Sequence, residues 1–121
     1  MWKNVVGLTL VLLIVGAAPG RADWTQVAKS QSNQRFSVNP DSIRRDGRFA
    51  WFWFRYQTAY EGQPLTFDTY TSADCTTRQY RRRQQIEHWQ GQRRTGNDDQ
   101  RLRQASAGEP MWSVLERVCA Q

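Results

Sequence analysis

The stretch Phe49-Ala50-Trp51-Phe52-Trp53-Phe54-Arg55-Tyr56 decides the fold of this chain, because six of its eight residues are aromatic. Side chains of a β-strand alternate between its two faces. One face would carry Phe49, Trp51, Trp53 and Arg55, and the opposite face Ala50, Phe52, Phe54 and Tyr56. A strand that is apolar on both faces needs cover on both, so it cannot lie at a solvated sheet edge. We therefore expect it to be the central strand of a small antiparallel sheet.

The residues before this stretch have the pattern of a hairpin and two turns. Residues 24–30 and 35–38 are short apolar-polar segments separated by a polar turn, which predicts two paired strands. Pro40 lies where a single helical turn would begin. Asp46-Gly47 is a strong tight-turn signal directly before the aromatic strand. The turn helps to set the register of that strand.

The residues after it predict further strands. Residues 58–64 are expected to form a loop, and residues 65–71 a strand with Leu65 and Phe67 on one face. Residues 76–92 fit a long, partly exposed strand better than a helix, because a helix would leave Tyr80 away from Ile86 and Trp89. The shared face of that strand would hold Tyr80, Arg82, Gln84, Ile86 and His88.

The C-terminal part combines a polar segment with an amphipathic helix. Residues 93–108 predict a mobile loop over their first half and a short strand near residues 101–105. Glu109-Pro110 then begins a helix, since proline is favoured in a first turn. Its apolar stripe consists of Met111, Val114, Leu115 and Val118. We expect this stripe to cover one side of the aromatic strand.

The N-terminal residues predict export. A short start containing Lys3 precedes an apolar run over residues 5–18 and small residues before Asp23, the pattern of a secretory signal peptide. The run is shorter than the roughly 20 residues of a spanning helix; the alternative is an uncleaved anchor. We expect residues 1–22 to be a signal peptide and residues 23–121 one domain without a membrane span. Removing Lys3 and Arg21 lowers the formal net charge from +6 to +4.

Cys75 and Cys119 are the only cysteines of the chain. An even number of cysteines in an exported protein favours one disulfide. Metal binding would need more ligands than a lone His88 provides, so we expect no metal and no cofactor. Catalysis would also depend on that histidine, and no G-x-S-x-G motif is present. We predict that the protein is not an enzyme, unless a pocket holds His88 beside a carboxylate. The adjacent Asp98-Asp99 pair is expected to be solvated.

A basic run is the most distinctive surface feature. Its members are Arg78, Arg81, Arg82, Arg83, Arg93 and Arg94. In an extended strand Arg81 and Arg83 would point to one face and Arg82 to the other. The run is either a patch for an anionic partner (lipid phosphate, acidic polysaccharide or an acidic protein surface) or a charged edge that prevents unwanted pairing. Nucleic acid is not expected as a partner, because the chain is exported and has no recognition module.

Several short segments together resemble the surface-adhesin protein E family of exported bacterial proteins. They are Trp24-Thr25-Gln26-Val27, Phe36-Ser37-Val38-Asn39-Pro40-Asp41-Ser42-Ile43-Arg44, Asp46-Gly47, Trp51-Phe52-Trp53-Phe54, Asp74-Cys75 and Val114-Leu115-Glu116-Arg117-Val118-Cys119. The resemblance spans nearly all of residues 24–119 and implies a small antiparallel sheet with a C-terminal helix tied by a disulfide. It also implies export and display at the cell surface. The matching residues are structural, so no binding residue is transferred.

These observations predict an α+β domain: an antiparallel sheet of about five to six strands, with a C-terminal helix packed on it and tied by the disulfide. The expected function is that of an exported, non-enzymatic binding protein, periplasmic or at the cell surface. It would contact an extracellular protein or an anionic envelope surface through the arginine run. The alternative is a structural or envelope-maintenance protein of the periplasm without adhesin activity.

Overall fold

A computed structural model describes residues 23–96 and 100–120. The predicted signal peptide at residues 1–22 and the Asp98-Asp99 pair lie outside the described residues. Within the described ranges, no helix has the length and apolar character needed to cross a membrane.

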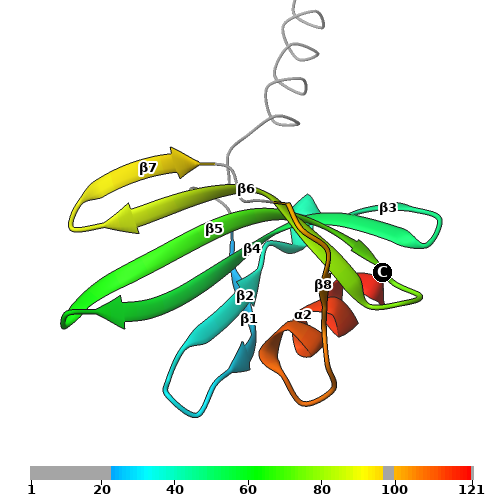
Figure 1. The fold of residues 1–121 in the computed structure, drawn as a ribbon, viewed down its shortest axis with the longest axis horizontal. Helices are drawn as coiled ribbons and strands as arrows, with labels where there is room; N and C mark the ends of the chain where they lie inside the picture. The colour runs from blue at the N-terminus through cyan, green and yellow to red at the C-terminus, as the bar shows by residue number, and fades with distance from the viewer. Residues whose placement is uncertain (1–22, 97–99, 121) are drawn as a thin grey trace, which may run out of the picture.

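The described residues form one antiparallel sheet and one α-helix (Figure 1). The elements are β1 (Thr25–Lys29), β2 (Arg35–Val38), a 3₁₀ turn (Pro40–Ser42), β3 (Arg44–Asp46), β4 (Phe49–Tyr60), β5 (Gln63–Asp74), β6 (Gln79–Trp89), β7 (Gln92–Gly96), β8 (Arg103–Gln104) and α2 (Pro110–Cys119). Six strands follow the order β1-β2-β4-β5-β6-β7; β3 also pairs with β4, and β8 with β6. The six-stranded path agrees with the predicted strand number, and the two short strands β3 and β8 add to it.

The aromatic stretch forms the first two thirds of β4, between β2 and β5. Its alternation follows the prediction: Ala50, Phe52 and Phe54 are buried on the side of α2. The opposite face is half-buried at Trp51 and Trp53. On that face Tyr70 of β5 packs between the two indoles, with ring centroids 6.2 and 5.3 Å away. The two faces of β4 therefore serve different purposes: one is core, and the other remains partly open to solvent.

Helix α2 packs against β1, β2 and β4 on the inner side of the curled sheet (Figure 1). Val114, Leu115 and Val118 have no exposed surface, and they join Val38 and Phe52 in the core. This confirms the predicted apolar stripe, in which only Met111 is less deeply buried.

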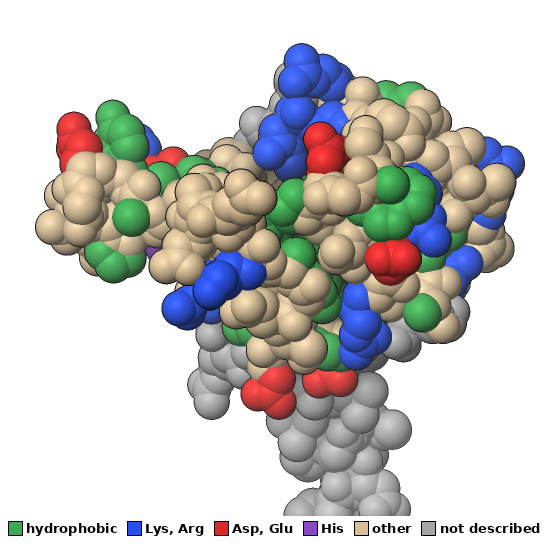
Figure 2. All heavy atoms as spheres, turned by 90° about the horizontal axis from the view of Figure 1, so that it is seen from below, with side chains coloured by type: hydrophobic (Ala, Val, Ile, Leu, Met, Phe, Trp, Pro, Cys, Tyr) green, Lys and Arg blue, Asp and Glu red, His purple; other side chains and the backbone are tan. Residues whose placement is uncertain are grey.

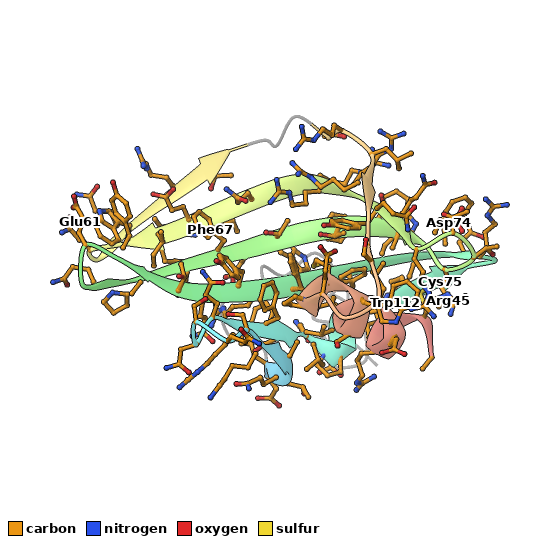
Figure 3. The ribbon with its side chains drawn as sticks, turned by 60° about the horizontal axis from the view of Figure 1, so that its bottom comes forward. Arg45, Glu61, Phe67, Asp74, Cys75 and Trp112 are labelled. Carbon is orange, nitrogen blue, oxygen red and sulfur yellow. A yellow bond between two sulfur atoms is a disulfide. The ribbon has the colours of Figure 1, made fainter. Side chains whose placement is uncertain are left out.

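The predicted disulfide between Cys75 and Cys119 is formed. It joins the residue after β5 to the last residue of α2. Near it, Arg45 donates a hydrogen bond to the carbonyl of Cys119 at 2.9 Å. Figure 3 shows Arg45, Cys75 and Trp112 together at one end of the molecule, far from Glu61 at the tip of the β4–β5 hairpin. The helix is thus attached at its C-terminal end both covalently and by a side-chain hydrogen bond.

Two predicted loops are wrong, because they belong to strands joined by two-residue turns. Residues 58–64 are paired strand except for Glu61 and Gly62, which have φ of 52° and 75°. Residues 93–96, predicted to be loop, form β7 together with Gln92, after a turn at Gln90 and Gly91, which have φ of 51° and 77°. Two successive positive φ values describe the turn that best matches the twist of a hairpin. Glutamate and glutamine rarely occupy its first position, so the sequence did not reveal it.

A third prediction, one shared face for Tyr80, Arg82, Gln84, Ile86 and His88, is wrong because β6 contains a β-bulge. Arg82 lies opposite Thr71 and Gln84 opposite Tyr70, so Arg83 is one residue too many between them. Directly opposed residues of antiparallel strands share a face, and an extra residue exchanges the faces of all later residues in the strand. Gln84, Ile86 and His88 therefore lie on one face, whereas Tyr80 and Arg82 lie on the other.

Candidate functional site

The structure does not bring all six predicted arginines together. Arg81 and Arg83 lie on the face of the sheet opposite α2, and Arg93 lies on that face farther along, opposite His88. Arg94, with Glu87, is on the α2 side of the sheet, where its Nη2 donates to the Glu87 carboxylate at 2.9 Å.

The remaining two arginines belong to the side of α2. Arg78 lies in the turn before β6, with its guanidinium carbon 4.9 Å from the centre of the Trp112 ring. Arg82 points to the same side of the sheet as Tyr80. The predicted patch is therefore reduced to Arg81 and Arg83, with Arg93 as a more distant neighbour.

Arg81 and Arg83 are fixed in position by the segment that leads to β8. Arg81 Nη1 donates to the backbone carbonyl of Gln100 at 2.9 Å, and Arg83 Nη1 donates to Gln100 Oε1 at 3.0 Å. Arg83 Nε also donates to Ser72 Oγ at 2.9 Å, and its guanidinium lies over the Trp51 ring at 5.4 Å. Each hydrogen bond uses only part of the guanidinium, which carries five N–H donors. The cations are held in place while further donors remain for a partner.

Apolar side chains adjoin these cations. A hollow of ≈ 280 Å³ is lined by Trp51, Arg81, Arg83 and the 47% exposed Leu102, among others. Phe49, 44% exposed, forms another part of its wall. We call this surface the arginine–tryptophan face; it comprises Phe49, Trp51, Ser72, Arg81, Arg83 and Leu102. Tryptophan and arginine are the residue types that contribute most to protein interfaces.

Among the described residues, Asp74 is the one carboxylate that lines this hollow, and its negative charge is balanced by Arg48. A hydrogen bond from the Arg48 guanidinium holds the pKa of Asp74 below its ordinary value, and the backbone N–H groups of Thr76 and Thr77 act in the same direction. The same ion pair raises the pKa of Arg48. Asp74 therefore stays charged and paired with Arg48, which leaves Arg81 and Arg83 to determine the potential of the hollow.

A buried ionic cluster on the same face was not predicted. Asp68 has 1% exposure and accepts hydrogen bonds from Arg55 Nε at 2.6 Å and Nη2 at 2.9 Å. His88 Nε2 lies 3.1 Å from Asp68 Oδ2, the oxygen that also accepts from Arg55 Nη2, and His88 borders a separate hollow of ≈ 480 Å³. Arg55 also lies 4.4 Å from the Trp24 ring. A histidine beside a carboxylate is the arrangement that would reopen the question of catalysis.

The geometry of this cluster favours a structural role. Both oxygens of Asp68 accept from Arg55, so the three side chains join β4, β5 and β6 across the sheet. The residues that border the hollow beside His88 include a single hydroxyl, that of Thr66, and no cysteine. In the described part of the chain, no group of three or more His, Cys, Asp or Glu side chains could hold a metal ion.

The fold and this face define a small, disulfide-tied antiparallel domain with a cationic and aromatic surface. The model of one family, surface-adhesin protein E, matches residues 24–120. The chain belongs to that family, as the motifs in its sequence predicted. No curated protein and no solved structure matches the chain. Membership of this family indicates an adhesin-like surface protein.

Proposed function

We propose that this protein is an exported binding protein that recognises an acidic segment of a partner protein through its arginine–tryptophan face. Arg81 and Arg83 supply the charge, and Trp51 supplies a flat apolar contact between them and the centre of the sheet. Membership of the adhesin family supports a partner outside the cell. Catalysis has no part in this function.

The positioning of the two guanidiniums by Gln100 and Ser72 is the observation that carries the proposal. Arginine side chains lose considerable rotamer entropy on binding, and contacts made in advance reduce that cost. A solubilising edge would need only loosely held charges. The aromatic ring under Arg83 adds a cation–π contact that keeps the guanidinium plane over the sheet.

The test compares the purified exported protein with the double variant Arg81→Gln, Arg83→Gln. A matched control is Lys29→Gln, Arg35→Gln, which removes two exposed charges from a cross-strand pair far from this face. Binding to immobilised poly-glutamate is measured by surface plasmon resonance at several salt concentrations. The first variant should bind about tenfold more weakly at low salt, a difference that salt reduces. The control should stay within roughly twofold.

Equal losses of poly-glutamate affinity in both variants would show that binding follows net charge alone. That result would refute binding at the arginine–tryptophan face. The alternative function, maintenance of the envelope, is tested by parallel capture from extracellular matrix proteins and from envelope extract. Capture from the matrix that depends on Arg81 and Arg83 supports the adhesin function. Capture confined to envelope components supports the alternative.

A further inference from the structure

A second hollow lies on the α2 side of the sheet, and Tyr80 borders both it and the hollow of the arginine–tryptophan face. Its volume of ≈ 400 Å³ falls in the size range of small-molecule sites. We call it the aromatic groove; its residues in this argument are Phe36, Phe54, Tyr56, Phe67, Arg82 and Met111. Figure 2, which views the molecule from this side, shows apolar side chains gathered between polar and cationic ones.

The apolar wall of the groove is built across three neighbouring strands. Phe36 of β2 packs on Tyr56 of β4 with ring centroids 4.9 Å apart, and Tyr56 stacks on Phe67 of β5 at 6.1 Å. Met111, from the first turn of α2, contributes a flexible side chain that adapts to the shape of a ligand. The rings are only partly buried, so a continuous aromatic surface follows the curl of the sheet.

The other end of the groove is cationic because Arg82 lies beside Tyr80 on this face of β6. Beyond the β-bulge, Gln85 rather than Gln84 continues the same face. Burial raises the pKa of the Tyr80 hydroxyl, and the nearby positive charges of Arg103 and Arg82 act against that rise. Glu109 is the carboxylate near this hydroxyl, and it already accepts a hydrogen bond from the backbone N–H of Ser106.

We propose that the aromatic groove binds a single-chain carboxylic acid of the fatty-acid class. The acyl chain would lie along Phe36, Tyr56 and Phe67, where it leaves water. The carboxylate would lie against the guanidinium of Arg82 and accept a hydrogen bond from the Tyr80 hydroxyl. A charge-assisted contact of this kind fixes the orientation of an otherwise featureless chain. A flexible chain also suits a curved groove better than a rigid ring system does.

Chain length and charge give two separate measurements. Octanoate, decanoate and dodecanoate are titrated by calorimetry below their micelle concentrations, and decanol serves as the neutral probe. Each additional buried methylene should tighten binding about fourfold until the groove is full. Decanoate should bind at least tenfold more tightly than decanol, because only the acid can use Arg82.

The variants make use of two adjacent arginines, Arg82 and Arg83, that lie on opposite faces of the sheet. Arg82→Gln should remove the preference for decanoate over decanol, whereas Arg83→Gln, on the opposite face, should leave both affinities unchanged. Gln85→Trp places an indole in the groove and should weaken acid and alcohol alike. Circular dichroism establishes that each variant is folded; if Gln85→Trp is not, the Arg82 and Arg83 pair still decides.

Three results would overturn the proposal: no saturable binding of any probe, equal affinity for decanoate and decanol in the unaltered protein, or equal effects of Arg82→Gln and Arg83→Gln. None of these outcomes bears on the binding of acidic protein segments, which depends on the other face of the sheet.

Discussion

Replacing both Cys75 and Cys119 by alanine should lower the free energy of unfolding by about 4 kcal/mol. The bridge closes a loop with a sequence separation of 44. In the chain-entropy model, a loop of that length removes about 13 cal/mol/K from the unfolded ensemble, which gives this loss of about 4 kcal/mol at 25 °C. The loss is a large part of the roughly 5–14 kcal/mol that a domain of this size has in total.

The same substitution should leave the folded structure intact. Val114, Leu115 and Val118 of α2 have no exposed surface, and burying each is worth about 1.5–3 kcal/mol. Arg45 also holds the C-terminal end of the helix through the Cys119 carbonyl, a backbone group that alanine retains. Packing thus keeps α2 docked in the folded state, and the bridge acts chiefly by restricting the unfolded one.

The assay is urea unfolding of the oxidised protein and of the double alanine variant, followed by circular dichroism and tryptophan fluorescence. The midpoint should fall by about 2–3 M for a urea m value near 1.5 kcal/mol/M. The m value should rise slightly, because an unbridged unfolded chain exposes more surface. A loss below about 1 kcal/mol would refute the entropic argument. A loss of helical signal without denaturant would refute the claim that α2 stays docked without the disulfide.

Two further substitutions probe the ionic contacts. Asp68→Asn should cost about 3 kcal/mol in urea unfolding, because it leaves Arg55 and His88 without their buried carboxylate; a cost below about 1 kcal/mol would show that the cluster is energetically idle. Asp74 has a folded-state pKa below its unfolded value of roughly 3.9, so its pairing with Arg48 stabilises the fold above that pH and is lost as the pH falls through the folded-state pKa. The difference in urea midpoint between the unaltered protein and Asp74→Asn should therefore shrink from pH 5 to pH 2, and a constant difference would contradict this linkage.

The main framework of the fold could be predicted from the sequence because its signals are local and strong. Alternation from Phe49 to Tyr56 assigned the correct residues to each face of β4. Val114, Leu115 and Val118 recur at helical spacing, and an even cysteine count indicated the bridge to Cys119. The strand and helix patterns depend on periodicity, so several residues of each element carry the same signal.

The errors arise where a single residue alters the rest of a strand. The extra residue at Arg83 exchanges the faces of β6, and nothing in a run of three arginines indicates which of them bulges. The predicted arginine patch is divided between two surfaces, because Arg82 alternates with Arg81 and Arg83 and because Arg78 and Arg94 lie on the side of α2. The contact of Asp68 with Arg55 and His88 depends on the register of three strands, which residue types alone do not determine.

The central claim, that the arginine–tryptophan face contacts acidic partners, is tested most directly by nuclear magnetic resonance mapping of a bound glutamate-rich peptide. We predict shifts at the Trp51 indole N–H, at the Arg81 and Arg83 side chains and at the Ser72 amide, with no change at Val114 in α2. Shifts concentrated around α2 or the β1–β2 hairpin, with the Trp51 indole unmoved, would contradict the account.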